Sequence, residues 1–173
     1  MSHKQEKIFL GLTILVMVLI FISSSMTYRQ QTVVPELGRF NLNWLKKWLA
    51  PISIDYAGHT FSVKTDGLAG MVEFILRKLA HFGSNLLIGL FAYLGFTSLV
   101  PNFGVRAILV WLSATGYAAT DEFHQLLTGD RSPMIRDVML DSMGALTGVI
   151  LAMIIFMLIQ KKRPRKSRKY RVG

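Results

Sequence analysis

The chain has 173 residues, of which 51% are hydrophobic, and its mean hydropathy is +0.40. It has no cysteine, which excludes a disulfide framework and a thiolate metal site and leaves the redox state of its compartment undetermined. The apolar residues form long runs, and a helix needs ~20 of them to cross a bilayer. Composition therefore predicts a single domain of the integral membrane class.

The net charge of +10 is unevenly distributed. The segment 160–173 carries eight of the 20 Lys and Arg residues and no acidic residue. A basic tail directly after an apolar helix is typical of a cytoplasmic topology signal that also contacts anionic lipid. No aromatic platform or fold motif accompanies the charge, so we expect membrane lipids and no nucleic acid as partners.

The first apolar run predicts a transmembrane helix over 8–25. Lys4 and Lys7 precede it, as in a secretory signal peptide, and a cleaved signal is therefore the alternative. The run is long and lacks an Ala-x-Ala type of cleavage site, which favours a retained helix.

An extracytoplasmic segment is expected over 27–70, and it contains the stretch "FNLNWLKKWLAP". Phe40, Trp44 and Trp48 recur every four residues, and Lys46 and Lys47 point elsewhere. Trp and Lys at helical spacing predict a short helix at the bilayer interface. A helix that packs on the rest of the protein explains the same spacing equally well.

The stretch "ISIDYAGHTFSVK" predicts a β-hairpin folded about Ala57-Gly58. That fold pairs Tyr56 with His59, Ile54 with Phe61 and Ile52 with Val63. Because an isolated hairpin is marginally stable in water, we expect it to lean on the membrane domain or on the interfacial helix.

Three further membrane helices are predicted over 79–100, 105–121 and 138–159, which gives an all-α polytopic membrane protein with four crossings. The basic residues near both termini, together with Arg106 in a short turn, fall on one side. The positive-inside rule makes that side cytoplasmic. We therefore expect a multi-pass protein of the cell membrane whose termini are both cytoplasmic.

Polar residues follow one face of the second predicted helix. Glu73, Arg77, His81 and Asn85 are spaced four apart, so they form a slowly turning polar stripe in which Glu73 and Arg77 make a favourable ion pair. His81 and Asn85 lie within the apolar run, where an unpaired polar group is costly.

A second set of polar residues closes the third helix and opens the fourth. Asp121 and Gln125 are four apart, and so are Asp137 and Asp141. Gly144 and Gly148 follow Asp141 on the same face, and small residues at this spacing let membrane helices approach closely. We therefore predict one outward-facing polar pocket formed by His81, Asp121, Glu122, Gln125, Asp137 and Asp141, rimmed by Arg77, Lys78, Arg131 and Arg136.

The motifs "RKLAHF", "DEFHQ" and "GDRSPMIRDVMLDSMGALTG", in this order, resemble the VanZ-like family of bacterial membrane proteins. The resemblance covers roughly 73–159. Many members have Glu-Tyr where this chain has Ser84-Asn85, Pro-Gly where it has Gly129-Asp130, and Asn where it has Asp141. The resemblance implies a cell-envelope protein related to one linked to reduced susceptibility to teicoplanin-type glycopeptides; it implies no settled reaction.

Two functions are consistent with the pocket. In the first, it is an active site for a lipid-linked or glycolipid-like envelope molecule, or for a glycopeptide. His81, Asp121, Glu122, Asp137 and Asp141 are then the acid–base candidates, and Arg77, Lys78, Gln125 and Arg131 bind the substrate. In the second, the buried charges only bind a partner or lock the helices together. His124 is an alternative to His81 as the partner acid or base.

Other functional classes have less support. The chain lacks a Walker loop, a Gly-x-Ser-x-Gly elbow and an HExxH motif, so no cofactor is expected. We predict no metal, with a divalent cation held by histidines and carboxylates as a variant. A transporter is disfavoured because the sequence shows no internal repeat and no broken helix. The oligomeric state is not indicated.

Overall fold

The computed structural model describes residues 1–56, 58–127 and 135–161 and is mostly helical. The basic residues beyond 161 and the residues 128–134, which include Arg131, lie outside these ranges. The elements in chain order are α1 (His3–Ser24), α2 (Tyr28–Gln31), α3 (Val34–Leu37), α4 (Asn43–Leu49), β1 (Ser53–Tyr56), β2 (His59–Ser62), α5 (Val63–Gly95), α6 (Phe103–Leu127) and α7 (Ile135–Lys161).

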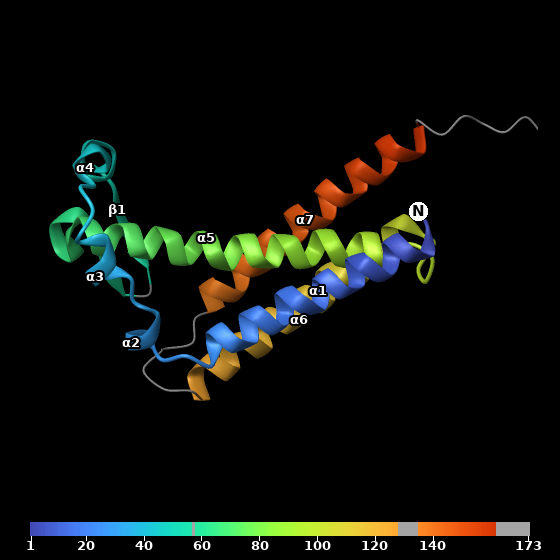
Figure 1. Ribbon diagram of the computed structural model, residues 1–173, viewed down its shortest axis with the longest axis horizontal. Helices are drawn as coiled ribbons and strands as arrows, with labels where there is room; N and C mark the ends of the chain where they lie inside the picture. Colours follow the sequence, from blue (N-terminus) through green and yellow to red (C-terminus); the bar gives the residue numbers. More distant parts are fainter. Residues whose placement is uncertain (57, 128–134, 162–173) are drawn as a thin grey trace, which may run out of the picture.

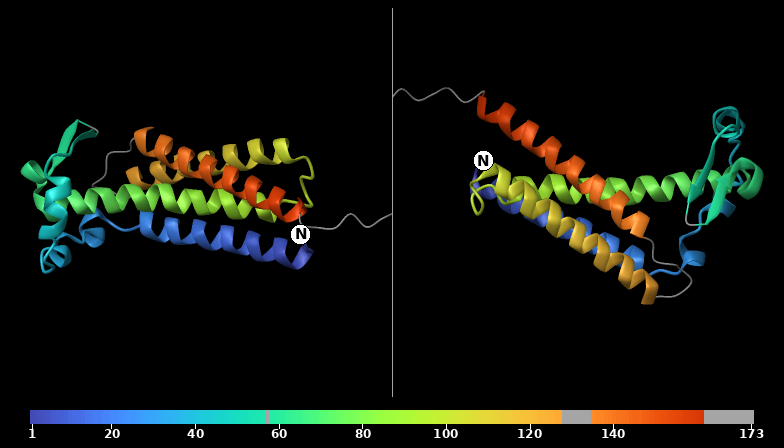
Figure 2. Two further views of the ribbon diagram at one scale, coloured as in Figure 1. Left: turned by 90° about the horizontal axis from the view of Figure 1, so that it is seen from above. Right: turned by 180° about the vertical axis from the view of Figure 1, so that it is seen from behind.

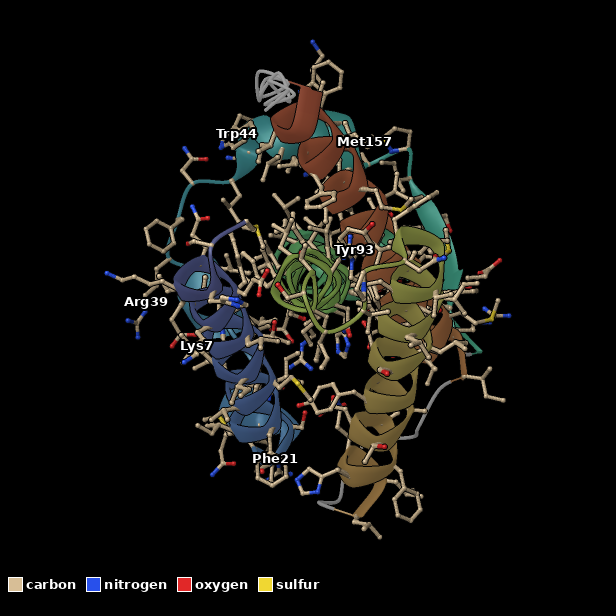
Figure 3. The ribbon with its side chains drawn as sticks, turned by 90° about the vertical axis from the view of Figure 1, so that its right-hand side faces the viewer. Lys7, Phe21, Arg39, Trp44, Tyr93 and Met157 are labelled. Atoms are coloured by element: carbon tan, nitrogen blue, oxygen red, sulfur yellow. The ribbon has the colours of Figure 1, made fainter. Side chains whose placement is uncertain are left out.

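The long helix α5 is the axis of the molecule. Viewed end-on, α1 and α6 flank it (Figure 3). At ~1.5 Å per residue its 33 residues span about 50 Å, more than the ~30 Å of a hydrocarbon core. Its first turns project past the ends of α1, α6 and α7, and the small elements between α1 and α5 gather there (Figures 1 and 2). The N-terminus lies at the opposite end.

Local sequence explains where α5 begins and bends. The Ser62 side chain accepts a hydrogen bond from the Thr65 backbone N–H, and the Thr65 side chain accepts one from the Ser62 N–H. This capping box starts the helix directly after the hairpin. Gly67 then adopts φ 72°, a left-handed conformation that favours glycine, and it kinks the helix.

Glycines bring α5 and α7 into backbone contact. A Cβ atom built at Gly148 would overlap the Leu86 carbonyl, and one at Gly144 would overlap the Phe82 carbonyl. From the other side, a Cβ atom at Gly89 would overlap the Ala145 carbonyl. The small-residue face predicted for the helix over 138–159, which is α7, therefore points into the bundle.

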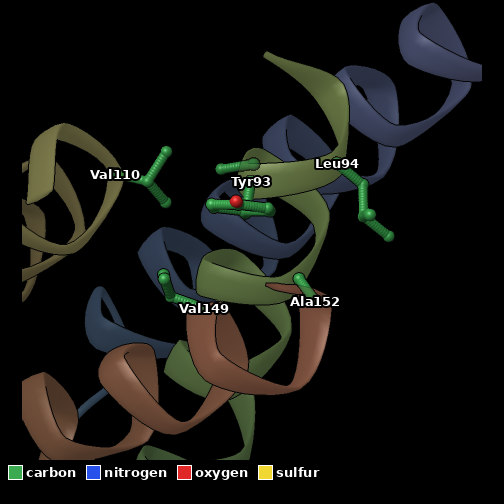
Figure 4. Close-up of a cluster of buried hydrophobic side chains, with 6 residues drawn as sticks. Tyr93, Leu94, Val110, Val149 and Ala152 are labelled. Atoms are coloured by element: carbon green, nitrogen blue, oxygen red, sulfur yellow. The ribbon is translucent and has the colours of Figure 1, made fainter. Parts of the chain in front are cut away.

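An apolar core fills the half of the bundle near the N-terminus. Figure 4 shows Tyr93 and Leu94 of α5 beside Val110 of α6 and Val149 and Ala152 of α7. Tyr93 and Val149 are each 1% exposed and Ala152 is fully buried. These side chains fill the end of the bundle that lies away from the hairpin.

Arg106, which the sequence places in a short turn, lies near the start of α6 and is 1% exposed. Its Nη1 donates to the carbonyls of Thr97 and Val100, at 3.1 and 3.0 Å, just after α5. Its guanidinium carbon lies 4.3 Å from the Tyr93 ring centroid. The end of α5 leaves carbonyls without helical partners, and a cation there is favoured. Arg106 therefore ties the α5–α6 turn together.

The β-hairpin has the predicted register over its four ladder pairs, including Ile54 with Phe61 and Tyr56 with His59. The pair of Ile52 with Val63 is wrong, because the Ser62 cap makes Val63 the first residue of α5. Phe61 stacks on Phe74 of α5, with ring centroids 4.0 Å apart. The hairpin thus leans on the first long turns of α5, as its marginal stability requires.

The short helix predicted in the stretch "FNLNWLKKWLAP" is present as α4, but Phe40 precedes it. The Asn41 side chain accepts a hydrogen bond from the Asn43 N–H, and this turn starts the helix later than the apolar spacing suggests. Trp44 and Trp48 are each 67% exposed, so neither packs into the protein.

By length and composition, two helices of the described chain could cross a membrane, His3–Ser24 and Ile135–Ile159. The helices that contain the predicted spans 79–100 and 105–121 extend over Val63–Gly95 and Phe103–Leu127. The predicted end of the second membrane helix at Val100 is therefore five residues beyond the end of α5 at Gly95. A turn held by Arg106 follows α5. The predicted extracytoplasmic segment 27–70 overlaps α5, because this helix begins at Val63.

Gly148→Leu should lower the thermal unfolding temperature in detergent, because a side chain there must push α5 and α7 apart. Overpacking of this kind typically costs about 1–3 kcal/mol. Gly116→Leu is the matched control, since a Cβ atom at Gly116 on α6 meets nothing within 4 Å. Equal unfolding temperatures for the two variants would contradict the packing of this interface.

Candidate functional site: a polar cavity among four helices

A cavity of about 280 Å³ lies in the half of the bundle nearer the hairpin. Helices α1, α5, α6 and α7 all contribute to its wall, together with a residue of α2. The polar residues lining it are Ser23, Ser24, Gln31, Arg77, His81, Ser84, Asn85, Tyr117, Asp121, Gln125 and Asp141. Five of the predicted site residues therefore line one cavity: Arg77, His81, Asp121, Gln125 and Asp141.

His81 and Asp141 form the contact across the α5–α7 interface. The Nδ1 atom of His81 lies 3.3 Å from Oδ2 of Asp141, whose side chain is 2% exposed. The two residues can approach because Gly144, one turn below Asp141, touches the backbone of α5. A histidine oriented by a buried carboxylate can accept or donate a proton at its other ring nitrogen.

Asp121 lies on the opposite wall and is held by two donors. The Ser24 hydroxyl of α1 donates to its Oδ1 at 2.5 Å, and Gln125 Nε2 donates to its Oδ2 at 2.8 Å. Ser24 is not among the residues predicted from the sequence. The signal that could have found it is the triplet Ser23-Ser24-Ser25 at the end of an apolar helix.

The predicted ion pair of Glu73 with Arg77 is present, with Nε 3.1 Å from Oε1. Glu73 is 2% exposed, and its Oε2 also accepts from the Thr32 hydroxyl at 2.7 Å and from the backbone N–H groups of Val33 and Val34. Glu73 therefore anchors the segment before α3 to α5. Arg77 reaches the cavity while its Nε is held by this carboxylate.

Lys78 and Asp137 pair with each other outside the cavity lining. Lys78 Nζ lies 2.5 Å from Asp137 Oδ1, and the Tyr56 hydroxyl donates to the same oxygen at 2.5 Å. Lys78 Nζ also lies 4.0 Å from the centroid of the Tyr56 ring. Burial, and then the hydrogen bond to Asp137, raise the pKa of Tyr56 above its usual range. The hairpin thus reaches the start of α7 through this cluster.

The remaining predicted residues lie elsewhere. Glu122 is buried, at 5% exposed, but does not line the cavity. His124 stacks on Phe21 with ring centroids 4.8 Å apart, also outside the lining. Arg131 lies outside the described residues. The geometry therefore favours His81 over His124 as the histidine of the site.

Within residues 1–56, 58–127 and 135–161, no three His, Asp or Glu side chains form a group that could hold a metal ion. Both carboxylate oxygens of Asp121 accept hydrogen bonds, from Ser24 and Gln125. One carboxylate oxygen of Asp141 lies against His81. The described residues therefore supply hydrogen-bonding and acid–base groups around this cavity.

Comparison with known proteins gives one family. The family model described as VanZ/LLP1 matches residues 9–157, which covers most of the chain. Among curated proteins nothing matches, and no solved structure matches.

Tyr56→Phe should loosen the hairpin without removing its ring contact with Phe74, whose centroid lies 5.7 Å from that of Tyr56. A hydrogen bond to a carboxylate contributes about 1.5–3 kcal/mol when buried, and less at this half-buried position. We expect the amides of 53–62 to exchange with deuterium several-fold faster.

Thr60→Val is the control for that measurement, because the Thr60 hydroxyl bonds only to the exposed Asp55 side chain of the neighbouring strand. Exchange that is equally fast in Thr60→Val and Tyr56→Phe would mean that the contact with Asp137 does not hold the hairpin.

Proposed function

The chain belongs to the VanZ/LLP1 family, and from that premise we propose that it is a multi-pass membrane protein of the bacterial cell envelope. In this proposal its polar cavity faces outward and binds the polar part of a lipid-linked or glycolipid-like envelope molecule. The molecule reaches the cavity from the outer leaflet of the membrane.

Four crossings follow if α5 and α6 span the bilayer beside α1 and α7. The two apolar helices support this arrangement, because α5 packs against both of them and α6 packs against α7 (Figures 1 and 2). Lys4 and Lys7 at the N-terminal end favour a cytoplasmic location for that end. The exposed Trp44 and Trp48 then lie on the outer side, where tryptophan favours the interface.

The observation that carries the proposal is the convergence of buried ionisable groups on one cavity. Asp121 is 6% exposed and Asp141 is 2% exposed, and they come from different helices. Charged groups at membrane depth are costly, and function is their usual reason. A purely apolar packing of these helices would not need them.

The same groups can carry out chemistry on the bound molecule. His81, held by Asp141, is positioned to move a proton, and Asp121 supplies a second carboxylate across the cavity. Arg77 would hold the substrate together with Gln125. Glu122, Lys78, Asp137 and Arg131 remain further candidates from the sequence.

A scaffold function is the second candidate, and the ion pairs favour it. Lys78–Asp137 and His81–Asp141 each join α5 to α7, and Glu73 joins α5 to the segment before α3. In that case the charges fix one arrangement of the helices. The outer face alone would then bind the envelope molecule or a partner protein.

His81→Gln tests the proposal against the scaffold function. We propose that the protein lowers susceptibility to teicoplanin-type glycopeptides, and we expect this protection to be lost in His81→Gln while the amount of protein in the membrane is unchanged. His124→Gln is the matched control, since His124 packs on Phe21 away from the cavity. Disappearance of the His81→Gln protein itself would support the scaffold function.

Single cysteines test the orientation, because the natural chain has none. Thr60→Cys, on an exposed strand position, should react with an impermeant maleimide added to intact cells. Lys4→Cys should react only after the membrane is opened. The reverse pattern would overturn the outward orientation of the cavity.

A further inference from the structure

Two buried acceptor atoms in the cavity wall have no hydrogen-bond partner among the residues that the structure describes. They are Oδ1 of Asn85 and Oδ1 of Asp141, in side chains that are 3% and 2% exposed. Both residues line the cavity, and they come from α5 and α7. A buried acceptor without a donor is unfavourable, so this wall is complete only when a donor enters.

The orientation of the Asn85 amide is fixed by its neighbour. Its Nδ2 donates to the His81 carbonyl at 3.2 Å. A flipped amide would place Oδ1 against that carbonyl, and two acceptors would then face each other. Asn85, a residue of the cavity lining, therefore keeps its oxygen as the unpaired acceptor.

The adjacent cations are already engaged with carboxylates. Arg77 Nε lies 3.1 Å from Glu73, and Lys78 Nζ lies 2.5 Å from Asp137. The carboxylates of Asp121 and Asp141 line the cavity itself. A phosphate or carboxylate at the Asn85–Asp141 wall would meet acceptors and negative charge, whereas a hydroxyl group would supply the missing donors.

We propose that the Asn85–Asp141 wall binds hydroxyl groups of a neutral, sugar-like head group through Oδ1 of Asn85 and Oδ1 of Asp141. This inference rests on the proposed function and names the class of ligand for the same cavity. The volume of about 280 Å³ is just below the ~300–1,000 Å³ of drug-sized ligand sites, so it suits one small head group rather than an extended oligosaccharide.

The test uses the full chain in nanodiscs of phosphatidylcholine, whose head group carries no hydrogen-bond donor. Each preparation also contains one added lipid at equal amount: monoglucosyl diacylglycerol for hydroxyls, phosphatidylethanolamine for an ammonium group, or phosphatidic acid for a phosphate. Lipid retained by the purified protein is measured by native mass spectrometry. We expect glucosyl lipid to be retained at least tenfold over each of the other two.

Asn85→Leu should lower retention of the glucosyl lipid about tenfold, as loss of one donor–acceptor contact predicts. Thr147→Val is the matched control, because the Thr147 hydroxyl bonds only to the Met143 carbonyl of its own helix. Ala80 is an exposed residue of the cavity lining, so the bulky side chain of Ala80→Phe should take up room in the cavity and abolish retention of the glucosyl lipid.

Preferential retention of phosphatidic acid or phosphatidylethanolamine, sensitive to Ala80→Phe, would overturn the hydroxyl assignment and leave the proposed binding function intact. Retention of glucosyl lipid unchanged by both Asn85→Leu and Ala80→Phe would place its site elsewhere. Equal, weak retention of every lipid would contradict the proposed function together with this inference.

Discussion

The contact between the backbones of α5 and α7 is the constraint on which the rest of the structure depends. Gly89, Gly144 and Gly148 leave no room for side chains between these two helices. At that short distance the next residues along α7 face α5 directly, so Asp141 meets His81 and Asp137 meets Lys78. Close packing of small residues is an efficient way to join helices in lipid, where hydrophobic attraction between them is absent.

The polar side chains are accommodated because nearly every one has a partner from another element. Asp121 is satisfied by Ser24 of α1, and Glu73 by Thr32 and by backbone N–H groups near α3. Such pairs offset the cost of removing charge from water, although they are not a strong source of stability. Asn85 and Asp141 each keep one buried side-chain oxygen without a donor beside the cavity, among the residues that the structure describes.

The hairpin is coupled to the same groups. Tyr56 bonds to Asp137, and Phe61 stacks on Phe74, so the hairpin rests on both α5 and α7. Movement of the hairpin would alter the surroundings of Lys78, whose ammonium lies over the Tyr56 ring. The structure therefore joins the hairpin to the helices that line the cavity, through a few contacts at one end of the bundle.

Sequence patterns alone determined that the chain is mostly helical, the hairpin register, the small-residue face of α7 and five residues that line the cavity. These features repeat at short, fixed spacings along the chain, so local periodicity suffices to find them. Tertiary structure decided what no spacing contains: that α1 contributes Ser24, that Tyr56 bonds to Asp137, that Arg106 is buried, and that Glu122 and His124 lie outside the lining. Each of these depends on how separate helices approach one another, since residues about 80 to 100 positions apart in the chain meet only after the bundle has packed.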